Sequence, residues 1–149
     1  RMRALVDAIE AGAFGDVMRV QEYAEAAGAW VASATDVARW ISVVDGAPGA
    51  RADVLSAGTL AAMTARPAYA TGTGGWYALG WQVVPEGAGV RWEHAGAQNG
   101  GDGYVARLPD GLVVVVLANL TRDASRGTLD PAVLQAVRRV TAWPAGTAF

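Results

Sequence analysis

The residues of this 149-residue chain that are best suited to chemistry lie together between His94 and Asn99. His94 is the only histidine, and an imidazole can exchange a proton near neutral pH. Ala95, Gly96 and Ala97 follow it and are small enough to let another molecule approach the backbone. A histidine can hold a substrate carboxylate or move a proton, and a free backbone N–H can bind a developing oxyanion. This stretch is therefore the candidate site.

Each of these residues also has a structural explanation. The histidine could end a strand and bond only to backbone, and Gly96 could pack against a helix or form a bulge. If the candidate site lines a cleft, four nearby polar residues could line it as well: Gln98, Asn99, Asp102 and Tyr104. A turn between two strands, however, selects Asn, Gly and Asp for conformational reasons alone. Taken singly, the structural explanation is the stronger one for His94, for residues 95–97 and for Asp102.

The composition argues against several other kinds of site. With no cysteine and one histidine, the chain lacks the usual ligands of a zinc centre and cannot form disulfides. All twelve basic residues are arginines, so a phosphate-binding loop with its lysine is absent. The net charge of −2, without a basic stripe, argues against a nucleic-acid partner, and no apolar run is long enough for a membrane span. We expect no metal and no cofactor.

Alternating apolar residues predict the strands that hold the candidate site. Residues 77–83 alternate in this way, and residues 90–97 and 104–108 indicate two further strands. A tight turn at Pro109-Asp110-Gly111 leads into the last strand, residues 112–120. This last strand is apolar on both faces, so we expect it to be central in its sheet and covered by helices on both sides.

Helical patterns flank these strands. Ser33 and Ser56 are each placed to cap the start of a helix, and Asp130-Pro131 starts a final one. Helices, then three or four antiparallel strands, then a helix predict an α+β fold in which helices pack on an antiparallel sheet. The length is that of one domain.

Several segments, in their order and spacing, resemble the serine β-lactamase-like family, which includes class C β-lactamases, DD-peptidases and related esterases. Residues 27–40 resemble its "AGG-L-x-S-T-A-x-D-L-A-R-F" stretch, residues 55–63 its "L-L-S-P-E-T-L-x-x-M" helix, and residues 77–81 its "Y-G-L-G-W" strand. His94-Ala95-Gly96 falls where the family has its Lys/His-Thr/Gly-Gly motif. Residues 108–119 resemble the hairpin that closes the family's sheet.

The resemblance implies a single partial domain over residues 1–149. Residues 27–149 would form the C-terminal part of a β-lactamase/transpeptidase-like fold, and residues 1–26 are an N-terminal helical segment with no place in the pattern. The resemblance favours a protein that is secreted or located in the cell envelope, and a cytoplasmic location is the alternative.

The chemistry that the resemblance implies is acyl transfer through a serine ester. His94 takes the role of the first motif residue, which supports proton transfer and binds substrate anions. Ala97 follows the motif glycine and would donate its backbone N–H to the oxyanion. The residues expected to bind substrate beside the acyl group are Ala95, Gly96, Gln98 and Asn99. The substrate would be a small molecule or a peptide.

The chain departs from the family in its nucleophile. Ser-x-x-Lys requires a lysine, which this sequence does not contain, and none of its four tyrosines begins a Tyr-x-Asn element. We therefore expect the nucleophile to lie outside these residues, in the missing N-terminal part of the same protein or in a partner chain. The chain alone would then be inactive. The alternatives are a catalytically inactive family member that serves as a binding or assembly module, and an unrelated small α+β domain.

Overall fold

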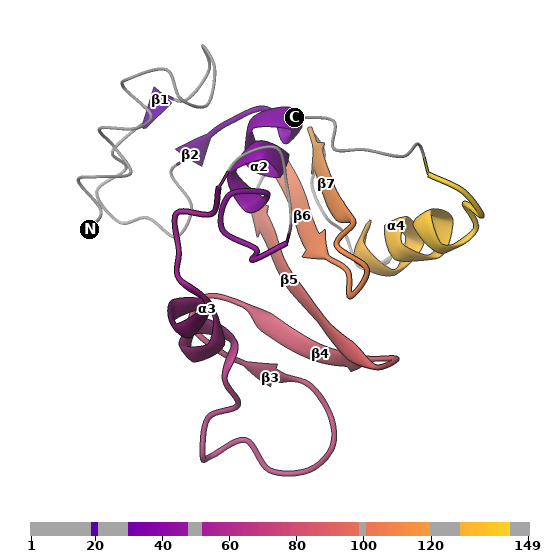
Figure 1. The fold of residues 1–149 in the computed structure, drawn as a ribbon. Coiled ribbons are helices and arrows are strands. Elements are labelled where there is room, and N and C mark those ends of the chain that lie inside the picture. Colours follow the sequence, from indigo (N-terminus) through magenta and orange to yellow (C-terminus); the bar gives the residue numbers. More distant parts are fainter. Residues whose placement is uncertain (1–18, 21–29, 48–51, 99–100, 120–128, 144–149) are drawn as a thin grey trace.

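The main sheet has five strands whose spatial order equals their order in the sequence. The computed structural model describes residues 19–20, 30–47, 52–98, 101–119 and 129–143 (Figure 1). The sheet order is β3-β4-β5-β6-β7, and every neighbouring pair is antiparallel. The strands are β3 (Trp76–Tyr77), β4 (Gln82–Glu86), β5 (Gly89–Gln98), β6 (Gly101–Arg107) and β7 (Val113–Ala118). A separate pairing joins β1 (Arg19–Val20) to β2 (Trp30–Val31).

Three helices in the described part accompany the sheet, and two of them begin at the predicted serines. They are α2 (Ala34–Ile41), α3 (Ala57–Thr64) and α4 (Leu129–Arg138). The Ser33 hydroxyl accepts a hydrogen bond from the Asp36 N–H at 3.1 Å, and the Ser56 hydroxyl accepts one from the Thr59 N–H at 3.1 Å. These bonds satisfy N–H groups that have no partner within a first helical turn. None of the described helices is long and apolar enough to cross a membrane.

The helices cover both faces of the sheet and create two cores. On one face, buried Trp81, Val83 and Trp92 pack with Ile41 of α2 and Leu60 of α3. The rings of Trp40 and Trp92 lie 6.3 and 6.2 Å from that of Trp81, which is the centre of this cluster. On the other face, α4 contributes Leu134 to a cluster whose strand residues are Tyr104, Ala106, Leu108 and Val114. The predicted α+β arrangement of helices on an antiparallel sheet is confirmed.

The predicted strand over residues 77–83 was wrong, because a turn divides it. β3 ends at Tyr77, and β4 begins at Gln82. Between them, the Ala78 N–H donates to the Trp81 carbonyl at 2.8 Å, and Gly80 has a φ of +85°. A glycine adopts this left-handed conformation without strain, so the alternating pattern contained a hairpin turn.

The central position expected for the last strand was also wrong. β7 pairs with β6 and forms the edge of the five-stranded sheet within the described part of the chain. Val114 is its buried residue, whereas Leu117 is 50% exposed. A run that is apolar on both faces indicates what lies above and below a strand, and it carries no information about which strands lie beside it.

Candidate active site

The candidate site lies where β5 extends beyond the end of β4. β4 pairs with β5 from Glu86–Gly89 to Gln82–Glu93, whereas β6 pairs with β5 as far as Gln98. Among the described strands, residues 94–98 therefore have a neighbour on the β6 side alone. We call this stretch the open edge; β5 is visible as the longest strand in Figure 1.

The alternation of an antiparallel ladder determines which backbone groups face the open edge. Glu86 and Gly89 flank a two-residue turn, and such flanking residues exchange hydrogen bonds. Every second residue of β5 from Gly89 therefore directs its N–H and C=O toward β4. Continued past the end of β4, this alternation places the N–H groups of Ala95 and Ala97 on the open edge. A bound molecule could use both donors.

Gly96 has no close neighbour on its side-chain side among the described residues. A Cβ atom built on Gly96 would meet no described atom within 4 Å. The β5–β6 register also runs without interruption from Trp92 to Gln98, so this ladder has no bulge. Neither of the two structural explanations for Gly96, helix packing or a bulge, is met by the described residues. No described residue fills the space above Gly96.

His94 stands at the start of the open edge, with an exposed side chain. Its Nδ1 lies 3.5 Å from the hydroxyl oxygen of Tyr77, and the two rings are 6.4 Å apart with a tilt of 55°. In the sequence, Tyr77 belongs to the alternating pattern of residues 77–83, and no local signal connects it with the histidine. The β3–β4–β5 register brings Tyr77 level with Glu93, the residue immediately before His94, because Tyr77 pairs with Gln82 and Gln82 pairs with Glu93.

Of the four other residues of the predicted cleft, two lie away from the open edge, one ends it, and one is not described. Asn99 lies outside the described residues, and Gln98 ends β5 with a side chain that is not described. Asp102 and Tyr104 are buried on β6, and the Tyr104 hydroxyl donates to a Glu93 carboxylate oxygen at 2.6 Å. The candidate site in the described structure is therefore His94, Tyr77 and the backbone of residues 95–97.

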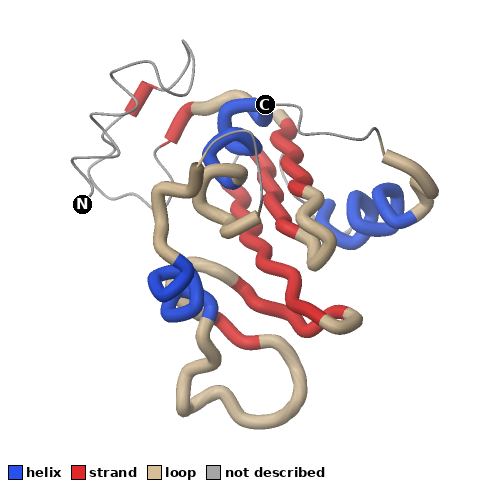
Figure 2. The backbone as a smooth tube through the Cα atoms, viewed as in Figure 1, coloured by secondary structure: helices blue, strands red, loops and turns tan. Residues whose placement is uncertain are grey.

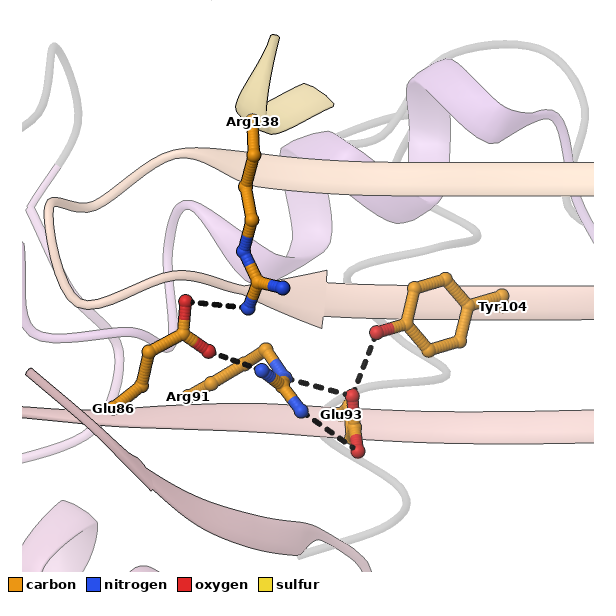
Figure 3. A network of polar contacts seen from close by, with 5 residues as sticks. All are labelled: Glu86, Arg91, Glu93, Tyr104 and Arg138. Atoms are coloured by element: carbon orange, nitrogen blue, oxygen red, sulfur yellow. Dashed lines mark hydrogen bonds and ion pairs between the residues drawn. The ribbon is translucent and has the colours of Figure 1, made fainter. Parts of the chain in front are cut away.

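A charged network on the α4 side of the sheet supports the strand that carries the site (Figure 3). The Arg91 guanidinium binds Glu86 and also donates to Glu93 at 2.8 Å. Glu86 in turn accepts from Arg138 of α4 at 2.7 Å. The network links α4, β4 and β5, and it includes the residue immediately before His94.

The network alters the ionisation of two of its members. Burial alone would raise the pKa of Glu86, but the hydrogen bond from Arg138 and the charges of Arg91 and Arg138 outweigh burial and lower it. Burial likewise opposes the charge of Arg91, yet its hydrogen bond and ion pair with Glu93, helped by Glu86, raise the pKa of Arg91. Both side chains are charged at neutral pH.

The lowered pKa of Glu86 predicts a loss of stability in acid. Because the folded-state pKa is below the unfolded value, this contribution is complete above about pH 4.5 and disappears as the pH falls through the folded pKa. We expect Glu86→Gln to lower the free energy of unfolding by roughly 1 kcal/mol at neutral pH and by progressively less in acid. Urea unfolding at several pH values measures this difference.

A double-mutant cycle with Arg138→Gln serves as the control for the Glu86 prediction. The coupling between the two substitutions should be present at neutral pH and should vanish in acid. A difference between wild type and Glu86→Gln that is the same at every pH would contradict the prediction.

The described residues contain no group of three His, Cys, Asp or Glu side chains that could hold a metal ion. The expectation of no cofactor stays a prediction.

Comparison with known proteins identifies the family. The family model described as Beta-lactamase matches residues 4–138. No curated protein and no solved structure matches the chain. The recognisable motifs begin at residue 27, whereas the match already begins at residue 4. The hypothesis that the chain is an unrelated α+β domain was wrong. The chain belongs to the Beta-lactamase family.

Proposed function

We propose that this chain forms the strand side of the active site of a serine hydrolase or acyltransferase. The enzyme would act on ester, amide or β-lactam carbonyls through an acyl-enzyme, and its nucleophile would come from a Ser-x-x-Lys motif outside residues 1–149. The observation that carries the proposal is the open edge. There, an exposed His94 adjoins two outward N–H groups and the free space above Gly96.

The open edge suits the charge that develops during acyl transfer. When a serine oxygen attacks the carbonyl carbon, the carbonyl oxygen becomes an oxyanion, and the Ala97 N–H donates a hydrogen bond to it. The β5–β6 ladder holds this donor in place before the reaction, so no reorganisation opposes the stabilisation. The leaving group departs with a proton, and water or another acceptor then cleaves the serine ester.

His94 would act on protons and substrate anions next to this donor. An imidazole can accept a proton at one nitrogen while donating from the other, which a lysine ammonium cannot do. A histidine at this motif position resembles the DD-peptidases and esterases of the family more than its most active β-lactamases. Gly96 leaves space for the acyl group, because a side chain at this position would stand in the open space above the strand.

The direct test measures hydrolysis of nitrocefin and of p-nitrophenyl esters. The chain is assayed alone and together with the polypeptide that lies upstream of it. We expect no turnover by the chain alone and turnover by the combination. Turnover by the purified chain alone would overturn the proposed division of labour. A correctly assembled combination that binds these compounds without hydrolysing them would instead favour the inactive binding module.

A matched pair of glycine substitutions forms the second arm of this test. Gly96 and Gly103 are directly opposite each other on β5 and β6. The methyl group added by Gly96→Ala would lie within 4 Å of no described atom. The methyl group added by Gly103→Ala would contact the Leu117 side chain at an ordinary distance of 3.5 Å. Both should keep or slightly raise stability, by up to about 1 kcal/mol. Only Gly96→Ala should lower kcat/KM, by about tenfold or more, because its methyl group displaces the acyl group. Equal activities in the two variants would contradict the role given to the open edge.

A further inference from the structure

Tyr77 makes a contact with His94 that the proposed chemistry leaves unexplained. The Tyr77 hydroxyl lies 3.5 Å from Nδ1 of His94, although the two residues are 17 positions apart and on strands that do not pair with each other. The Tyr77 ring is 49% exposed, so it contributes little to the core. A half-exposed aromatic side chain beside the only imidazole of the chain needs another explanation.

β3, the strand that carries Tyr77, is two residues long, and side-chain contacts add to its pairing with β4. The Trp76 indole N–H donates to the Thr64 carbonyl at 3.0 Å, and the Arg66 guanidinium lies 4.4 Å from the centre of the Trp76 ring. Arg66 also donates to the carbonyls of Ala70, Gly72 and Gly74. These bonds hold the long loop between α3 and β3, drawn in tan in Figure 2. These contacts fix the position of β3 beside β4.

We propose that Tyr77 is a positioning residue for His94. In the neutral imidazole one ring nitrogen accepts and the other donates. In the proposed arrangement the Tyr77 hydroxyl donates to Nδ1, which keeps the proton of the neutral ring on Nε2. Nε2 is then the nitrogen available to a substrate anion or a reacting hydroxyl.

The consequence for substrate binding rests on the proposed function, but the contact between the two side chains does not. Nε2–H at the open edge would recognise an anionic group, such as a carboxylate, next to the reacting carbonyl. The position of the ring can be measured without any turnover. Failure of the positioning role and failure of the proposed function are therefore distinguishable.

The test uses the fact that the chain has a single histidine. With ¹⁵N label confined to this chain, long-range ¹H–¹⁵N spectra of the assembled protein report the tautomer of one imidazole. We expect wild type to hold its proton on Nε2. Tyr77→Phe should raise the share of the Nδ1-protonated tautomer about fivefold, the ratio that corresponds to losing about 1 kcal/mol.

Tyr69→Phe is the matched control for this experiment. It also removes one phenol hydroxyl from an exposed ring, and that hydroxyl donates to the Tyr77 carbonyl at 3.3 Å. We expect its tautomer ratio to equal that of wild type, whereas a merely structural effect would appear in both variants. An unchanged ratio in Tyr77→Phe, or the same change in both variants, would overturn the positioning role.

Discussion

If the proposed function holds, His94→Ala is expected to lower kcat of the proposed enzyme by about 10²- to 10⁴-fold, the range for loss of a group that transfers protons. The side chain is exposed, so its removal should alter the free energy of unfolding by no more than about 0.5 kcal/mol. Steady-state kinetics with a p-nitrophenyl ester, together with urea unfolding, measure both quantities. A large loss of activity without a loss of stability would assign the effect to the reaction itself.

His94→Lys provides the control for this prediction. The family motif has lysine or histidine at this position, so the lysine variant should retain more activity than the alanine variant. If alanine and lysine variants were both as active as wild type, His94 would have no part in the reaction. The open edge would then act through its backbone alone.

Trp81→Ala is expected to lower the free energy of unfolding by about 3–5 kcal/mol, the typical loss when a buried tryptophan is truncated. Trp81 is 6% exposed, and its ring packs against those of Trp40 and Trp92. Truncation would remove the centre of the core that joins α2 to the sheet. Urea unfolding followed by far-ultraviolet circular dichroism gives the loss without depending on tryptophan fluorescence.

Trp143→Ala makes the same chemical change at a surface position, where the side chain is 49% exposed. Its effect should be within about 0.5 kcal/mol. Similar losses in the two variants would mean that the Trp81 cluster does not hold this face of the sheet together.

Local signals in the sequence predicted the helix starts and the strands that carry the site. Ser33 and Ser56 act through bonds to residues three positions away, which a short window of sequence contains. The stretch from His94 to Ala97 follows a strand pattern, and that strand is β5. Such features depend on near neighbours, so the sequence alone is enough to predict them.

Features that depend on distant segments escaped prediction. The alternation through residues 77–83 looked like one strand, because a hairpin turn with a glycine preserves the apolar spacing on both sides. The contact between Tyr77 and His94 exists only once three strands adopt their register. The free space above Gly96 is equally invisible in a sequence, since a small residue is compatible with both close packing and an open surface.

The meander order of the main sheet has a consequence for folding kinetics. Strands that are neighbours in space are also neighbours in the sequence, so the sheet has low contact order and can form quickly. Contacts between segments that are distant in the sequence are expected to form later. The ion pair of Arg107 with Asp45, at a separation of 62 residues, is an example. The ladder that presents the open edge can thus assemble from residues 76–118 alone, before contacts between distant segments form.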